Sequence, residues 1–79
     1  MPGLRLYSRP ACHLCDYAVL MLHESGAGLE LETVNIEEEL GLLARYDTAV
    51  PVFQRLDTCA ELYWPFDDDD LEMFLEGAQ

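Results

Sequence analysis

Residues 7–15 read YSRPACHLC and contain the most informative motif of the chain. They overlap a short apolar, strand-like run, Leu4 to Tyr7, and the β-strand predicted from it spans Leu4 to Ser8. Pro10 cannot continue a central strand, because it lacks the N–H group that a neighbouring strand would bind. A helical pattern begins at Cys12 and includes Cys15. The sequence therefore predicts a Cys-x-x-Cys motif at a junction between a strand and a helix.

The placement of the two cysteines favours redox chemistry. A cysteine at the start of a helix lies beside free backbone N–H groups and the positive end of the helix dipole, which favour its thiolate. We expect Cys12 to be the nucleophile and Cys15 to be the resolving thiol that attacks the mixed disulfide. The alternative is half of a zinc site, but zinc usually needs four ligands. No second Cys-x-x-Cys or His pair is visible, so we expect no bound metal.

Three further residues have two interpretations each. His13 either stabilises the Cys12 thiolate as a cation or is an ordinary solvated residue, and the sequence leaves both open. Arg9 either contacts an anionic group of the substrate or is a plain loop charge, and we favour the contact. Cys59 lies beside the predicted hairpin turn, where we interpret it as a bystander; an exposed thiol open to glutathionylation or dimer formation is the less favoured interpretation.

Hydrophobic periodicity predicts the elements of the first half of the chain. The helix that begins at Cys12 ends at Gly26, and its apolar positions are Leu14, Tyr17, Ala18, Met21 and Leu22. The alternating segment Leu29 to Ile36 predicts a strand at a sheet edge. Residues 35–39 are polar and acidic and predict the start of a second helix. The apolar stripe expected on that helix is Leu40, Leu43 and Ala44.

The second half predicts a hairpin and a final helix. Strands are expected over Val50–Leu56 and Cys59–Trp64, separated by a turn at residues 57–58. Four aspartates at 67–70 suit the N-terminus of a helix, and Gly77 is a natural stop for it. The long first crossover predicts parallel strands and the hairpin antiparallel ones. The resulting fold is a single α/β domain over residues 1–79, with order β-α-β-α-β-β-α, a four-stranded mixed sheet and helices on both faces.

The charge balance limits the partners. The chain carries a net charge of −12 and only four basic residues besides two histidines. Nucleic acid is therefore excluded as a partner, while basic protein surfaces are favoured and anionic small thiols disfavoured. No secretion signal or apolar run of membrane-spanning length is present, so we expect a cytoplasmic monomer that does not contact membranes.

Motif and element order together resemble the thioredoxin-like fold in its minimal glutaredoxin form, over essentially the whole chain. The matching segments are residues 7–15, Thr-Ala-Val-Pro at 48–51 and Asp-Asp-Leu at 69–71. The resemblance implies that the peptide bond before Pro51 is cis and that Pro51 lies beside the active-site disulfide. The candidate substrate-binding residues are Arg9, His13, Val50, Pro51 and Asp69.

The chain also departs from the glutaredoxin pattern. Cys-His-Leu-Cys replaces Cys-Pro-Tyr-Cys, and residues 65–67, Pro-Phe-Asp, replace the glycines that approach glutathione in the family. Leu4 to Ser8 contains no carboxylate that could serve as a general base, so that role is unassigned. We therefore expect weak glutathione binding and no other cofactor.

The Cys-x-x-Cys motif and the resemblance together predict a thiol–disulfide oxidoreductase that reduces protein disulfides or mixed disulfides. Two alternatives remain open at this point. One is a metal or iron–sulfur carrier that uses the same thiolates. The other is a non-catalytic thioredoxin-like adaptor that binds partners through the loop at Pro51. The sequence does not name the electron donor, whether glutathione or a reductase, or the target.

Overall fold

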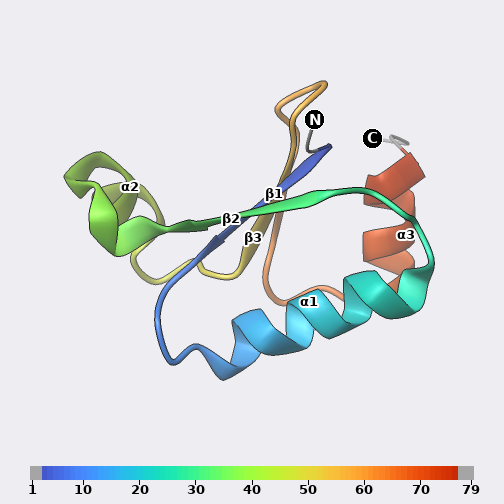
Figure 1. Cartoon of the computed structure of the whole chain (residues 1–79), viewed down its shortest axis with the longest axis horizontal. Helices are drawn as coiled ribbons and strands as arrows, with labels where there is room; N and C mark the ends of the chain where they lie inside the picture. The colour runs from blue at the N-terminus through green and yellow to red at the C-terminus, as the bar shows by residue number, and fades with distance from the viewer. Residues whose placement is uncertain (1–2, 77–79) are drawn as a thin grey trace.

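The computed structural model describes residues 3–76. Within this range the elements follow the predicted order β-α-β-α-β-β-α, with one 3-10 turn added (Figure 1). They are β1 (Leu4–Ser8), α1 (His13–Ser25), β2 (Leu31–Asn35), η1 (Ile36–Glu38), α2 (Leu40–Tyr46), β3 (Val52–Arg55), β4 (Glu61–Tyr63) and α3 (Asp68–Glu76). Gly77, the predicted stop of the last helix, lies outside the described residues.

The four strands form one mixed sheet in the order β2-β1-β3-β4. β1 runs parallel to β2, so the first crossover joins parallel strands as predicted. β3 is antiparallel to both β1 and β4, which confirms the predicted hairpin. β2 lies at an edge, where the alternating pattern placed it.

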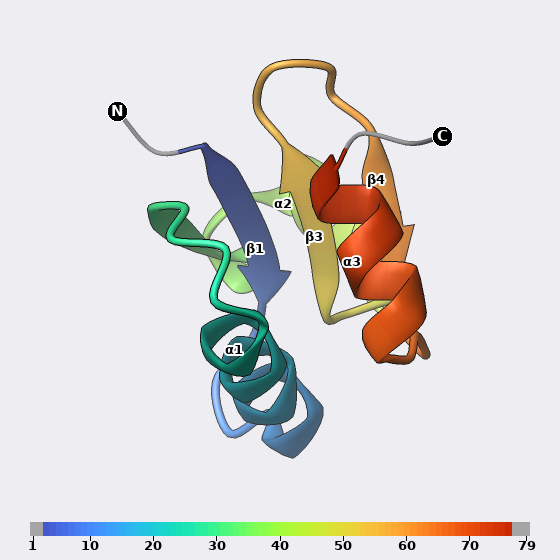
Figure 2. The same cartoon turned by 90° about the vertical axis from the view of Figure 1, so that its right-hand side faces the viewer.

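Helices cover both faces of the sheet. Figure 2 shows α1 and α3 in front of the strands and α2 behind them. Leu6 packs with the α1 and α3 side, whereas the next residue, Tyr7, packs with the α2 side. This follows because successive side chains of a strand point to opposite faces. The larger of the two buried clusters contains Leu4, Leu6, Ala18, Met21, Leu22, Phe53, Phe66, Leu71 and Phe74. The smaller contains Tyr7, Ile36, Tyr46 and Val52.

The four aspartates at 67–70 lie at the start of α3, where two of them cap the helix. The Asp67 carboxylate accepts the backbone N–H of Asp70 at 2.8 Å, and the Asp70 carboxylate accepts that of Asp67 at 3.2 Å. This reciprocal pair satisfies two N–H groups that a helix start otherwise leaves free. Phe66, just before it, is buried against Phe53 with ring centroids 5.7 Å apart.

Two of the predicted apolar stripes are partly wrong. Leu14 and Tyr17 of α1 are 47% and 58% exposed, and the buried face is formed by Cys15, Ala18, Met21 and Leu22 instead. Cys15 takes the inward position because it lies three residues before Ala18, on the same face of the helix.

The second helix also differs from its predicted pattern. Leu40 is 83% exposed, while Tyr46 is buried and stacks on Tyr7 with ring centroids 4.3 Å apart. The stacked tyrosine determines which face of α2 meets the sheet, and Leu42 and Leu43 pack beside it. Leu40 and Ala44 consequently face solvent.

Glu61 connects α2 to β4. Its side chain is 14% exposed and accepts hydrogen bonds from the hydroxyl of Tyr46, from that of Tyr63 at 2.8 Å, and from the guanidinium of Arg45 at 3.4 Å. Burial acts to raise the pKa of Glu61, but the two hydroxyls and the charge of Arg45 outweigh it and hold this pKa below its ordinary value.

We expect Glu61→Gln to lower the free energy of unfolding by about 1–2 kcal/mol near neutral pH, because the charged acceptor of these donors is lost. Since folding depresses the pKa of Glu61, its contribution is present above the unfolded-state pKa of about 4.3 and is lost as the pH falls through the folded-state value. Urea unfolding of both proteins near pH 7 and near pH 3 should show the difference shrinking in acid. Glu72→Gln, at an exposed carboxylate of α3, is the control; equal losses in both variants would contradict the prediction.

Candidate redox site

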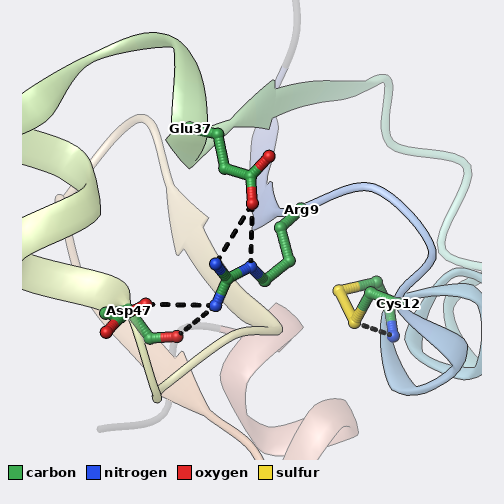
Figure 3. The surroundings of a disulfide bond; sticks show 5 residues. Arg9, Cys12, Glu37 and Asp47 are labelled. Atoms are coloured by element: carbon green, nitrogen blue, oxygen red, sulfur yellow. Dashed lines mark hydrogen bonds and ion pairs between the residues drawn. A yellow bond between two sulfur atoms is a disulfide. The ribbon is translucent and has the colours of Figure 1, made fainter.

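Cys12 and Cys15 lie where β1 leads into α1 (Figure 3). They are joined by a disulfide, and their Cα atoms are 5.2 Å apart. Ala11, just before them, has a φ of 58°, a left-handed conformation that costs a non-glycine residue about 1–2 kcal/mol. The turn at Pro10 and Ala11 separates β1 from α1, and Cys12 is the N-cap of α1. The local sequence thus places the first sulfur at a helix start, as the motif predicted.

The two sulfurs have different surroundings. Cys15 is 5% exposed and belongs to the inner face of α1, whereas Cys12 is only partly buried. The backbone N–H of Cys15 donates a hydrogen bond to Sγ of Cys12 at 3.1 Å. The arrangement therefore pairs an accessible sulfur, already in contact with a helix N–H, with an enclosed one.

The register of the strands brings several predicted site segments to one end of the sheet. Tyr7 pairs with Val52, so Pro51 lies at the end of the sheet where the chain leaves β1 for Cys12. Val52 also pairs with Tyr63, which places the segment leading to α3 at this end. The peptide bonds before Pro51 and Pro65 are both cis. Pro51 is fully buried and its carbonyl accepts the N–H of Trp64 at 3.2 Å.

The remaining predicted substrate residues lie in different settings. His13 is exposed in the first turn of α1, Val50 is partly buried beside the smaller core cluster, and Asp69 is exposed in the first turn of α3. Arg9 does not extend toward the disulfide. Figure 3 shows its guanidinium directed at Glu37 and Asp47.

The sequence does not predict the partners of Arg9. Glu37 lies in the turn after β2, and Asp47 directly follows α2. Ion pairs with both raise the pKa of Arg9, and the largest cause is the hydrogen bonding that Arg9 donates to the Glu37 carboxylate. Both carboxylates are far from Arg9 in sequence, and only their acidic character was a signal. Their meeting depends on the pairing of β1 with β2, which local sequence does not specify.

Other candidate chemistry lies outside this site. Cys59 is a free, exposed thiol in the turn between β3 and β4, at the opposite end of the sheet. Across residues 3–76, no three His, Cys, Asp or Glu side chains are grouped closely enough to hold a metal ion. Within the same residues, no helix combines the length and the hydropathy needed to cross a membrane.

Comparisons with known proteins extend over nearly the whole chain. The model of the glutaredoxin-like domain (DUF836) matches residues 3–76. The X-ray structure of the structural-genomics target XcR50 from X. campestris is 39% identical, with a TM-score of 0.86 over 98% of this chain and 100% of that one. The solution structure of Ne2328 from Nitrosomonas europaea is 31% identical, with a TM-score of 0.73 over 94% of this chain and 92% of that one. No curated protein matches.

Proposed function

The chain belongs to the glutaredoxin-like (DUF836) family, and from this premise we propose that it is a thiol–disulfide oxidoreductase acting on protein disulfides or mixed disulfides. The observation that carries the proposal is the asymmetry of the two sulfurs. The accessible Cys12 has its sulfur at a helix start, and the enclosed Cys15 lies one turn behind it. A nucleophile must reach the substrate, whereas a resolving thiol needs to reach only the mixed disulfide.

The reaction begins from the reduced protein. The Cys12 thiolate attacks one sulfur of the substrate; a Cys12–substrate disulfide forms and the substrate S–S bond breaks, releasing the first thiolate. Cys15, after losing its proton to solvent or to that thiolate, attacks Sγ of Cys12 and releases the second. Two electrons pass from the protein dithiol to the substrate, and the protein returns to the disulfide seen in the structure. An external thiol or dithiol donor must then reduce it.

The N–H of Cys15 gives this scheme its electrostatic basis. In the reduced protein the same donor and the positive end of α1 favour a thiolate at Cys12. His13, exposed beside it, can add positive charge when protonated. The scheme does not depend on His13, because the helix start and the N–H of Cys15 act without it.

Reduction of insulin and of hydroxyethyl disulfide tests the proposal, with glutathione and thioredoxin reductase offered separately as donors. Turnover with either donor supports an oxidoreductase and identifies the donor class. No turnover with either donor, together with specific capture of a partner through the loop at Pro51, would instead indicate the adaptor. Metal or an iron–sulfur chromophore in protein purified without oxygen would indicate the carrier.

We expect glutathione to bind weakly, with a dissociation constant above about 1 mM, and protein disulfides to be the better substrates. The net charge of −12 repels an anionic tripeptide, and the aspartates at the start of α3 add to this field at the redox end of the sheet. The same field favours targets with basic surfaces. A chemical-shift titration with glutathione checks the prediction. Sub-millimolar binding mapped to Arg9, Val50 and Asp69 would contradict it.

A further inference from the structure

The guanidinium of Arg9 is held by two carboxylates from distant parts of the chain. Its Nε and Nη2 donate to Oε2 of Glu37 at 3.4 and 3.1 Å. Its Nη1 donates to the backbone oxygen and to Oδ1 of Asp47 at 2.9 and 3.1 Å. An arginine has about five N–H donors, so these contacts leave it little capacity for another anion. Figure 3 shows the three side chains meeting away from the disulfide.

This cluster has a net negative charge, although it contains the arginine nearest to Cys12 in sequence. One positive and two negative groups sum to −1. An anionic substrate that approached Cys12 would have to displace Glu37 or Asp47 before it could pair with Arg9. A cationic substrate could pair with these carboxylates without displacing either of them from Arg9, since the Glu37 and Asp47 side chains are 44% and 58% exposed.

We propose that Glu37 and Asp47 are specificity-determining residues of the redox site, which by occupying Arg9 make Cys12 discriminate against disulfides that carry negative charge near the S–S bond. Neutral and cationic disulfides are the substrate class that this arrangement fits. The inference rests on the proposed function of the Cys12–Cys15 pair and identifies its substrates more closely.

Three symmetric disulfides that differ in the charge of their ends test the inference. They are 3,3′-dithiodipropionate, which is anionic, bis(2-hydroxyethyl) disulfide, which is neutral, and cystamine, which is cationic. Reduced protein carrying Cys59→Ser is mixed with each in a single turnover, and protein disulfide formation is followed by mass spectrometry. Each rate of oxidation of the protein is divided by the rate at which dithiothreitol reduces the same disulfide. This ratio removes differences in intrinsic reactivity among the three disulfides.

The variant of interest is Glu37→Gln/Asp47→Asn, and the matched control is Glu24→Gln/Glu72→Gln. Both remove two negative charges, but Glu24 and Glu72 are exposed at the far end of α1 and on α3. Alpha-helical rise puts the two ends of α1 about 20 Å apart. The control therefore reports the effect of total charge without touching Arg9.

At about 10 mM salt, where the Debye length is about 30 Å, we expect the first variant to raise the anionic-to-neutral rate ratio at least about threefold and to lower the cationic-to-neutral ratio similarly. The shifts should fade in about 1 M salt, and the control should move both ratios clearly less. Equal shifts in the two double variants would overturn the inference, because overall charge would then explain the selectivity. Unchanged ratios in the first variant would overturn it as well.

A binding measurement separates this inference from the proposed function. Suberate, a dicarboxylate in which two methylenes replace the S–S bond, is titrated while the Nε–H signal of Arg9 is followed by NMR. The double variant should show a saturating shift and the wild type none; equal binding would overturn the inference. If wild-type protein fails to reduce even the neutral disulfide, the proposed function is wrong. The suberate titration then tests by itself whether Glu37 and Asp47 keep anions from Arg9. Should the double variant not fold, Glu37→Gln alone should give a smaller shift of the same sign, and its absence would overturn the inference.

Discussion

Cys12→Ser is expected to reduce disulfide reductase activity to the uncatalysed background, a loss of at least about a hundredfold. A serine hydroxyl stays protonated under conditions in which a cysteine at a helix start forms a thiolate, so the first covalent step is lost. The substitution removes the more accessible sulfur of the pair. The remaining cysteine, Cys15, is buried and has no route to a protein substrate. Turnover of insulin and of hydroxyethyl disulfide measures the loss.

Alkylation supplies an independent readout for Cys12. With iodoacetamide in limiting amount, the reduced wild type should be labelled first at Cys12, which peptide mass spectrometry identifies. Cys59→Ser is the matched control, because Cys59 is the other accessible thiol of residues 3–76 and lies at the opposite end of the sheet. It should retain full turnover. Preferential labelling of Cys15 or Cys59 in the native protein, or full activity in Cys12→Ser, would show that Cys12 is not the nucleophile.

The parts of the fold predicted from sequence are those governed by local patterns. The bounds of β1, Leu4–Ser8, agree with the prediction because a proline and a helix signal follow directly. Gly26, with a φ of 70°, ends α1 where the glycine predicted it. The same holds for the capped start of α3. In each of these cases the interaction that ends or starts the element lies within a few residues.

The errors arise where distant residues meet. The prediction that Leu40 is buried is wrong because Tyr46 stacks on Tyr7 and orients α2, and nothing near Leu40 in the sequence signals that contact. The apolar character of Leu14 predicts a buried position for it, but the structure buries Cys15 and leaves Leu14 exposed. Among the candidate site residues, the position of Cys12 followed from the motif. The engagement of Arg9 by Glu37 and Asp47 did not, because it depends on tertiary pairing.

Cys15→Ser is expected to separate the two halves of the reaction. Cys12 can still attack, so a mixed disulfide between Cys12 and the target should form at close to the normal rate. Without the resolving thiol it should persist, and turnover of a protein substrate should fall by at least about tenfold. Because Cys15 is buried, the new hydroxyl costs stability; Cys15→Ala, which buries no polar group, serves as the second variant.

The trapped complex gives this prediction a direct measurement. In a Cys59→Ser background, a non-reducing gel should show a covalent adduct with a model disulfide protein that disappears on reduction, and mass spectrometry should place the bond at Cys12. Cys12→Ser in the same background should give no adduct, because the enclosed Cys15 cannot reach the target. An adduct that formed through Cys15 would invert the roles inferred from burial. Full turnover by both Cys15 variants would instead show that an external thiol resolves the mixed disulfide, so that the reaction needs one protein cysteine rather than two.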